Sequence, residues 1–200
     1  MFKDKKKIIS TVLCVAVLIT TLVVSYHLLS NYKIINVTGI SMEDTYISGE
    51  ILLCKKEKIE NIKYKDIIVF SKENGDGSLF IKRVIAVGNE KVKIENNKVY
   101  IDGEQLEEEY IKEDMSTPDM EEQDVPYMQL FVLGDNRNMS DDSRGSTIGF
   151  VNKDELVGKI VLNLSDYKIS KVMIIIVMIS LIAMLYIVAC TIKDDSTDET

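Results

Sequence analysis

Residues 79–87 have the sequence LFIKRVIAV, an apolar run of strand length that contains two adjacent cations. Its β-branched and aromatic residues favour an extended strand. Because side chains alternate between the two faces of a strand, Lys82 shares one face with Phe80 and Val84. The neighbouring Arg83 lies on the opposite face. Lysine is rarely buried without a partner, so composition alone favours an exposed edge position for Lys82.

The chain around this run continues as short apolar segments separated by Gly, Asn, Asp and Lys, a pattern typical of strands. The expected strands are residues 33–38, 51–55, 66–71, 79–87, 91–95, 98–101, 128–133 and 158–162. Between two of them, Asn96 and Asn97 are typical of a two-residue hairpin turn, because Asn tolerates positive φ better than most residues. The sequence therefore predicts a mainly β domain with mostly antiparallel sheets.

Two long apolar runs flank this domain. Residues 8–29 and 172–192 contain no Asp, Glu, Lys or Arg, and each can cross a hydrocarbon core, which needs roughly 20 helical residues. The lysines of residues 1–7 should keep the N-terminus in the cytoplasm. We therefore expect an N-terminal and a C-terminal transmembrane helix in a multi-pass protein of the cell membrane. Residues 30–171 would be extracytoplasmic, and residues 193–200 would form a cytoplasmic tail.

The first apolar run permits a second interpretation, a cleaved signal peptide, because its N-terminus is basic. The run is longer than the usual apolar region of about 7–15 residues, and no small-x-small cleavage site precedes Asn31. An uncleaved anchor is therefore favoured. The charges around the second run argue weakly against the expected orientation, since Lys168 and Lys171 lie on its outer side and only Lys193 on its inner side.

Residues 104–124, EQLEEEYIKEDMSTPDMEEQD, contain ten carboxylates and a single lysine. Such a composition offers too little apolar area to order itself, so we expect a solvated, mobile insertion without a core role. An acidic binding surface is the alternative. The whole chain has a net charge of −8, which argues against nucleic acid as a partner.

Elimination narrows the possible catalytic bases. The single histidine, His27, lies inside the first apolar run, which excludes a Ser-His-Asp triad, a Cys-His pair and a His-ligated metal centre. Two of the three cysteines lie in the apolar runs, so neither a disulfide framework nor a zinc site can be assembled, and no cofactor or metal is expected. Covalent hydrolysis would then use a carboxylate or a lysine made neutral by burial.

A candidate nucleophile, Ser41, lies in VTGISMEDT between an expected strand and a polar turn. Alone, such a residue is usually an ordinary surface serine. It is followed by GEILLCKK, YKDIIVF, IKRVIAVG and GDNRNMSDDSR. In this order the segments resemble those of type I signal peptidases, the S26 family, from about Val37 to Leu162.

The resemblance implies a signal-peptidase-like β fold and a Ser-Lys dyad of the bacterial kind. Ser41 would attack the scissile carbonyl, with its own backbone N–H as an oxyanion donor, and Lys82 would take the proton. Ser140 would orient the Lys82 amine by a hydrogen bond. Asp142 and Arg144 would form an ion pair that supports the loop.

The resemblance also implies the substrate class, exported preproteins with signal peptides. These would bind as an added β-strand, with small residues at the first and third positions before the cut. Ser41 follows Leu29 by 12 residues, which places it within about 40 Å of the lipid bilayer. Ile35, Ile40 and Met42 would then rest on the lipid surface or pack into the core.

Some positions depart from the family pattern. Asp44 replaces the usual Pro, Lys65 replaces the usual Gly, and Gly39 removes a side-chain hydroxyl that some relatives have. These departures concern substrate preference more than activity. The alternatives are a specialised or non-catalytic relative acting in surface-pilus or matrix protein assembly. A self-cleaving repressor is disfavoured by two apolar runs and the lack of a DNA-binding module.

Overall fold

The structure is a computed structural model that describes residues 2–43, 45–72, 77–111, 113–114, 116–166, 175 and 178. The chain divides into two units, which we describe separately. The first unit consists of residues 1–31 and 165–200 and contains helix α1 (Phe2–Asn31). Within the described part of the chain, no helix combines the length and the apolar character that a membrane span requires. The expected second span, residues 172–192, lies outside the described residues except at two positions.

The second unit, residues 32–164, is built from two antiparallel sheets. The larger sheet has the strand order β1 (Tyr32–Asn36), β2 (Ile51–Lys55), β11 (Leu156–Asn163), β3 (Ile67–Ser71), β4 (Leu79–Val87), β9 (Gln129–Leu133) and β10 (Val151–Asn152). The smaller sheet has the order β7 (Glu104–Gln105), β6 (Lys98–Ile101), β5 (Lys91–Glu95) and β8 (Met120–Asp124). Two short 3-10 helices, η1 (Ile59–Asn61) and η2 (Arg137–Met139), lie in the connections. The prediction of a mainly β, antiparallel domain is confirmed.

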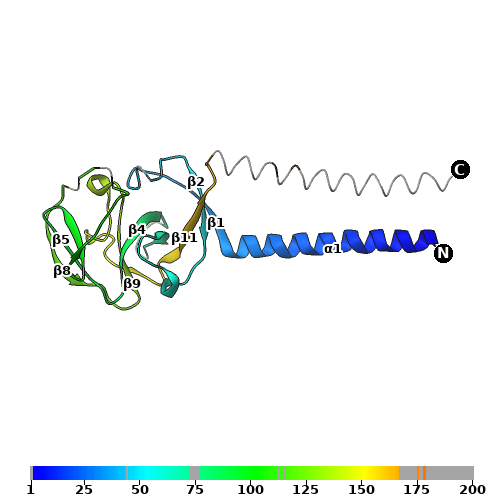
Figure 1. Ribbon diagram of the computed structural model, residues 1–200, viewed down its shortest axis with the longest axis horizontal. Helices are drawn as coiled ribbons and strands as arrows, with labels where there is room; N and C mark the ends of the chain where they lie inside the picture. Colours follow the sequence, from blue (N-terminus) through cyan, green and yellow to red (C-terminus); the bar gives the residue numbers. More distant parts are fainter. Residues whose placement is uncertain are drawn as a thin grey trace. The chain divides into compact units, whose positions relative to one another are not determined.

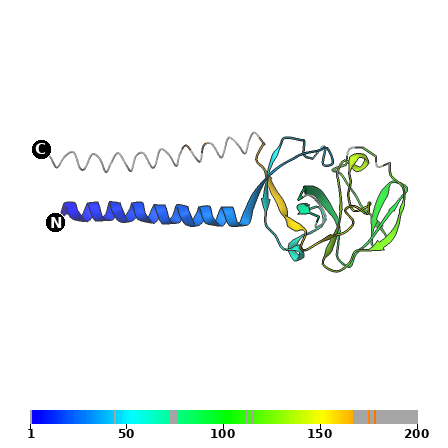
Figure 2. The same cartoon turned by 180° about the vertical axis from the view of Figure 1, so that it is seen from behind.

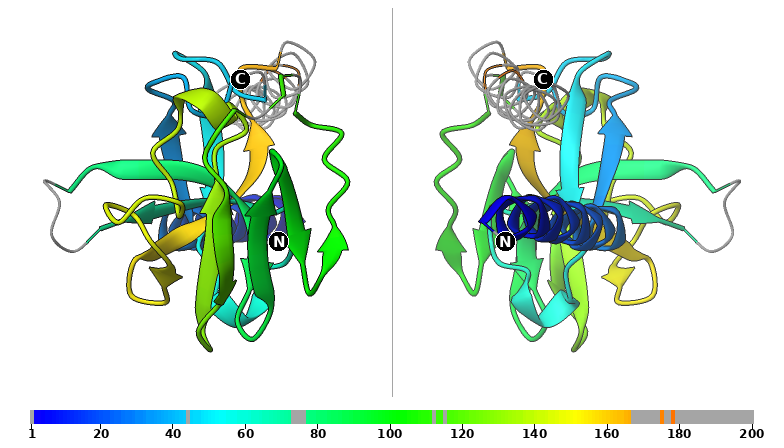
Figure 3. Two further views of the ribbon diagram at one scale, coloured as in Figure 1. Left: turned by 90° about the vertical axis from the view of Figure 1, so that its left-hand side faces the viewer. Right: turned by 90° about the vertical axis from the view of Figure 1, so that its right-hand side faces the viewer.

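Figures 1 and 2 show the smaller sheet and the β1, β2 and β11 strands at opposite ends of this domain. In the right panel of Figure 3, β11, β2 and β1 run side by side in the order of the sheet. Strand β1 is therefore an edge strand, whereas β4 is interior, between β3 and β9.

The apolar pattern located the main strands well. All eight expected strands are present, with ends within two residues of the predicted bounds. Asn96 and Asn97 have φ values of 51° and 62°, which confirms the tight turn between β5 and β6. Three short or acidic strands, β7, β8 and β10, were not expected, because two residues or a run of carboxylates carry no recognisable alternation.

The prediction that residues 104–124 form a solvated insertion without a core role is wrong. Strand β8 pairs with β5, and β7 pairs with β6. Leu106, Tyr110 and Met120 pack against a buried cluster that includes Val92 and Phe131. The few apolar residues of the segment thus reach the core while most of its carboxylates stay exposed, so overall composition was a poor guide.

The interior position of β11 depends on a glycine. A Cβ atom at Gly158 would meet the backbone carbonyl of Lys55 and lie 2.9 Å from the Cys54 sulfur. Gly158→Ala should therefore lower the free energy of unfolding by about 2–3 kcal/mol, because the neighbouring backbone has to move. Urea unfolding of the full chain in detergent, followed by circular dichroism, would measure this.

Gly145→Ala is the matched control, since its nearest obstacle is the flexible Asp141 carboxylate at 3.3 Å. Its stability should be unchanged or higher by up to about 1 kcal/mol. Equal stability of the two variants would show that β11 does not need this close approach.

Candidate active site

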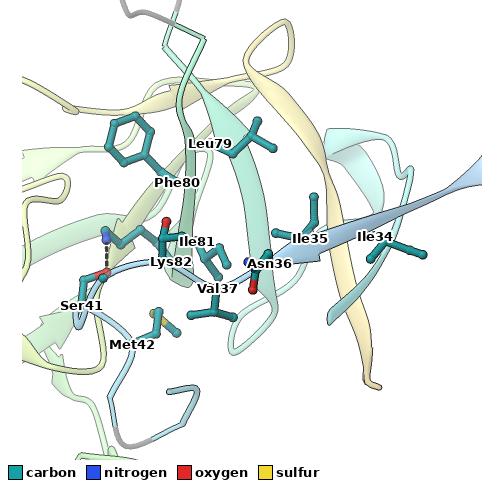
Figure 4. Close-up of a pocket in the computed structure, with 12 residues that line it drawn as sticks. Ile34, Ile35, Asn36, Val37, Ser41, Met42, Leu79, Phe80, Ile81 and Lys82 are labelled. Atoms are coloured by element: carbon teal, nitrogen blue, oxygen red, sulfur yellow. Dashed lines mark hydrogen bonds between the residues drawn. The ribbon is translucent and has the colours of Figure 1, made fainter. Parts of the chain in front are cut away.

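Lys82 and Ser41 are joined by a partly buried hydrogen bond. Lys82 Nζ lies 2.6 Å from Ser41 Oγ, and Lys82 is only 3% exposed. Figure 4 shows the amine aimed at the hydroxyl, at one end of a set of residues from β4 and from the chain around β1. Composition alone favoured an exposed Lys82, but the side chain enters the interior of the domain.

The surroundings of Lys82 favour a neutral amine. Burial removes water from the ammonium and lowers the pKa of Lys82 below its usual value. The negative charges of Asp142 and Asp141 act against this shift, and the positive charge of Arg144 adds to it. When the amine is neutral, the Ser41 hydroxyl can donate its proton to Nζ, as a general base requires.

The backbone of Ser41 is fixed from two directions. Its carbonyl accepts a hydrogen bond from the Asn136 N–H at 3.1 Å, and the Asn136 side-chain amide donates to the Ile40 carbonyl at 3.1 Å. On its other side, the turn is closed by N–H donors of Thr45 and Tyr46 that bind the Met42 carbonyl. The chain segment around Ser41 is therefore bound to the loop that begins at residue 134.

Gly134 allows this close approach. A Cβ atom at this position would lie 2.5 Å from the Ser41 carbonyl oxygen and would also collide with the Ser140 side chain. Among the described residues, no acceptor binds the Ser41 N–H. This N–H therefore remains able to donate to another oxygen near the hydroxyl.

The predicted supporting ion pair is present. The Arg144 guanidinium binds both oxygens of Asp142, at 2.7 and 2.8 Å, and Asp142 is only 1% exposed. Asp142 also accepts a hydrogen bond from the Gly134 N–H at 3.1 Å. In turn, Arg144 donates to the Arg137 carbonyl at 2.7 Å. The pair thus fastens both sides of the loop.

The expected hydrogen bond from Ser140 to the Lys82 amine does not form among the described residues. Ser140 Oγ donates instead to the Asp141 carbonyl at 3.5 Å. Its side chain packs where a Cβ of Gly134 would lie, so it faces its own loop.

The sequence analysis missed a second buried ion pair next to the site. Arg83 donates to Asp135 with Nε at 2.8 Å and Nη2 at 2.6 Å, and Thr45 Oγ1 donates to the same carboxylate at 2.5 Å. The Arg83 guanidinium also lies 4.0 Å from the centre of the Tyr110 ring. The strand alternation did place Arg83 opposite Lys82, but nothing in the pattern identified Asp135, 52 residues away.

A groove of about 240 Å³ begins at the Ser41–Lys82 pair. Its lining comes from residues 34–39, 41–42 and 79–82. Residues 79–82 of β4 pair with β3, whereas β9 pairs with β4 only from Arg83 onward. One wall is therefore the edge strand β1, and the other is a segment of β4 whose second edge has no strand partner in the described part of the chain.

Two of the three residues expected at the lipid surface or in the core are core residues. Ile35 and Met42 are buried, whereas Ile40 is exposed. The alternation along β1 and its extension turns Ile35 and Val37 into the cluster with Leu52 and Val69.

Comparison with known proteins relates most of the chain to one family. The family model described as "Signal peptidase, peptidase S26" matches residues 6–165. Signal peptidase I U of Bacillus subtilis (strain 168) is 31% identical over 166 residues, which cover 78% of this chain and 87% of the relative. Signal peptidase IB of Staphylococcus aureus (strain COL) is 27% identical over 176 residues, covering 78% and 88%. A solved signal peptidase I from Enterococcus faecalis V583, at 30% identity, covers 54% of this chain and all of that one, with a TM-score of 0.45.

The β domain holds Ser41 and Lys82 in a hydrogen bond and has no histidine between residues 30 and 171. The relatives place the chain in the class of serine peptidases. The family match spans most of the chain, and the chain therefore belongs to the signal peptidase family, peptidase S26. Its enzymatic type is that of the type I signal peptidases, which are serine endopeptidases.

The charges around Lys82 predict a pH effect. Asp141 is exposed and raises the pKa of Lys82. Asp141→Asn should therefore lower that pKa further, so that the amine becomes neutral at lower pH. The acidic limb of the kcat/KM profile for preprotein cleavage should move to lower pH.

Asp154→Asn removes an equally exposed carboxylate that is not among the charges acting on Lys82. Its profile should coincide with that of the wild type. If the acidic limb of the Asp141→Asn profile moved to higher pH, it would contradict the inference that Asp141 raises the pKa of Lys82.

Proposed function

We propose that this chain is a membrane-bound serine endopeptidase that removes N-terminal signal peptides from exported preproteins, with Ser41 as nucleophile and Lys82 as general base. The observation that carries the proposal is the 2.6 Å contact between Lys82 Nζ and Ser41 Oγ, made by an amine that burial drives toward its neutral form. A neutral primary amine in contact with a hydroxyl can accept its proton when that oxygen attacks a carbonyl.

Acylation follows from these two groups. Ser41 Oγ attacks the scissile carbonyl carbon while its proton passes to Lys82 Nζ. The carbonyl oxygen becomes an oxyanion that the Ser41 N–H can bind. When the tetrahedral intermediate collapses, the C–N bond breaks and the new amine of the mature protein takes the proton from Lys82. The signal peptide remains as an ester on Ser41.

Deacylation repeats the sequence with water. Lys82, neutral again, takes a proton from a water molecule that attacks the ester carbonyl. The second intermediate collapses with Ser41 Oγ as leaving group, and the proton on Lys82 returns to it. Asp141 and Asp142 support both stages, because their negative charges stabilise the transient ammonium.

Oxyanion binding in this chain relies on the backbone. The Ser41 N–H has no acceptor among the described residues, and a donor of this kind contributes about 3–4 kcal/mol in other hydrolases. Gly39 has no side chain that could act as a second donor. We propose that Asp142 and Arg144 preserve this geometry by fixing the loop, and that Ser140 acts by packing against Gly134 rather than by binding the amine.

The groove supports an extended substrate with small side chains near the cut. Strand β1 and residues 79–82 of β4 each offer a backbone edge, so a peptide can bind as an added strand. The walls contain Ile35, Val37 and Phe80, and the groove measures about 240 Å³. A groove this size favours small residues at the first and third positions before the cut, whose side chains point to the same side of a strand.

The two apolar runs support membrane attachment. The support comes from the sequence, where residues 8–29 and 172–192 contain no Asp, Glu, Lys or Arg and each run has the roughly 20 residues that a bilayer span needs. We propose that both cross the cell membrane and leave residues 30–171 on the extracytoplasmic side. A substrate held in the same bilayer by its own apolar segment would then present its cleavage site near Ser41.

The dyad predicts a sharp mutational result. Ser41→Ala and Lys82→Ala should each abolish cleavage of a preprotein with an Ala-x-Ala site in detergent. Lys82→Arg should fail as well, because a guanidinium does not release its proton at any working pH. Gel-based cleavage assays with purified full-length variants would measure the loss, and circular dichroism would establish that each variant is folded.

Lys153→Arg is the matched control, since Lys153 is exposed and remote from the groove lining. It should cleave at the wild-type rate. Substantial cleavage by folded Ser41→Ala or Lys82→Ala would refute the dyad and would show that another nucleophile or another base acts. Absence of cleavage by the wild type would favour the non-catalytic assembly role.

The membrane topology can be tested with terminal epitope tags. In intact cells stripped of their wall, added protease should digest residues 30–171 while tags at both termini survive. Both tags should become sensitive only after the membrane is lysed. Digestion of the C-terminal tag in intact cells would show that residues 172–192 do not cross the membrane.

A further inference from the structure

The acidic segment supplies the partner of a fully buried cation. Arg137 follows Asn136 in the active-site loop and is only 3% exposed. Its guanidinium binds both carboxylate oxygens of Glu108, at 2.8 and 2.5 Å. Paired, two-point contacts of this kind fix orientation as well as charge. Glu108 thus has a specific contact, unlike its exposed neighbours Glu107 and Glu109.

Glu108 is itself fixed in place. The Tyr110 hydroxyl donates to Glu108 Oε1 at 2.6 Å, and the Tyr110 ring lies against the Arg83 guanidinium at 4.0 Å. Arg83 in turn binds Asp135 through two hydrogen bonds. The carboxylate that binds Arg137 is therefore connected to both sides of the loop that approaches Ser41.

A second contact binds the same segment to η2. The Ser116 N–H donates to Asn138 Oδ1 at 2.8 Å, and Asn138 Nδ2 donates to the Asp114 carbonyl at 3.2 Å. Glu108, Asp114 and Ser116 thereby contact consecutive residues of η2, Arg137 and Asn138.

The turn at residues 134–137 carries these contacts to the nucleophile. Arg137 Nε donates to the Gly134 carbonyl at 3.0 Å, which closes the turn around Asn136. Asn136 then binds the carbonyls of Ser41 and Ile40, both at 3.1 Å. The path from Glu108 to Ser41 thus consists of hydrogen bonds between named atoms and of the peptide chain of residues 134–137.

We infer that Glu108 is a positioning residue for Ser41, acting through Arg137 and the turn at residues 134–137. The inference rests on the proposed function of Ser41 as nucleophile. Without the Glu108 carboxylate, the buried Arg137 would lack its counter-charge and would move toward water, because an unpaired buried cation is unfavourable. The Gly134 carbonyl and Asn136 would shift with it, and so would the backbone of Ser41.

The test compares Glu108→Gln with Glu109→Gln in the full-length protein, assayed in detergent with an Ala-x-Ala preprotein. Glu108→Gln should lower kcat by about 10- to 100-fold, the penalty of displacing a reacting group by an ångström or less. KM should change by less than about threefold, because Glu108 is not part of the groove lining. Glu109→Gln, which changes an exposed carboxylate, should retain the wild-type kcat.

The assay temperature is set well below the unfolding midpoint of each variant, so that a purely stabilising role would leave kcat of the folded enzyme unchanged. Arg137→Lys provides a second measure that retains the buried positive charge. Arg137→Lys should lower kcat as Glu108→Gln does. The compact lysine ammonium lacks the planar fork with which the guanidinium binds the Glu108 carboxylate and the Gly134 carbonyl at the same time.

Wild-type kcat in folded Glu108→Gln or Arg137→Lys, beside an inactive Ser41→Ala, would overturn the positioning role and leave the proposed function standing. Activity in Ser41→Ala would overturn both. An equal loss of kcat in Glu109→Gln would overturn the positioning role of Glu108. The loss would then come from the charge of the acidic segment and not from the contact between Glu108 and Arg137.

Discussion

Desolvation of the Lys82 amine is the constraint on which the site depends. A lysine in water is almost wholly protonated at neutral pH and cannot act as a base. In this chain, β4 carries the side chain into the interior, where the charged form is disfavoured, while Asp141 and Asp142 moderate the shift. The pKa of Lys82 therefore depends on the balance between burial, which lowers it, and the two carboxylates, which raise it. Weaker burial would leave the amine charged, whereas the loss of both carboxylates would make the ammonium formed during catalysis harder to reach.

The two adjacent cations of β4, Lys82 and Arg83, lie on opposite faces of the strand and have different partners. Arg83 donates to Asp135 from Nε and Nη2, along one edge of its guanidinium, and remains charged. Lys82 receives a hydroxyl as its closest partner and no directly bound carboxylate among the described residues. Arginine suits a permanent ion pair, and lysine suits a group that must change its protonation state. The Lys-Arg sequence thus combines the proposed base and a structural cation in two consecutive residues.

The strands could be predicted from local sequence, and the pairing of Ser41 with Lys82 from the resemblance to type I signal peptidases, whereas the other partners across the fold could not. The apolar run at residues 79–87 predicted strand β4. It also predicted that Lys82 and Arg83 point to opposite faces, because the alternation of side chains along a strand depends only on local sequence. Asp135 and Glu108 could not be assigned in this way, since each pairs with a cation far away in sequence. The acidic segment was misjudged for a related reason. Composition counts carboxylates but does not show that Leu106 and Tyr110 reach the core.

The chain segment between β7 and β8 of the smaller sheet contacts the loop beside Ser41 through Glu108 and Arg137. A loop that approaches a nucleophile as closely as Gly134 approaches Ser41 needs rigid support, because its own residues are too few to form a core. Asp142 and Arg144 support it from within, and Glu108 supports it from the smaller sheet's own chain segment. The buried Arg137 guanidinium needs a counter-charge, and Glu108, in the segment between β7 and β8, supplies the carboxylate. An acidic segment with the composition of a surface insertion is therefore connected, through the buried Arg137–Glu108 pair, to the backbone of Ser41, the proposed nucleophile.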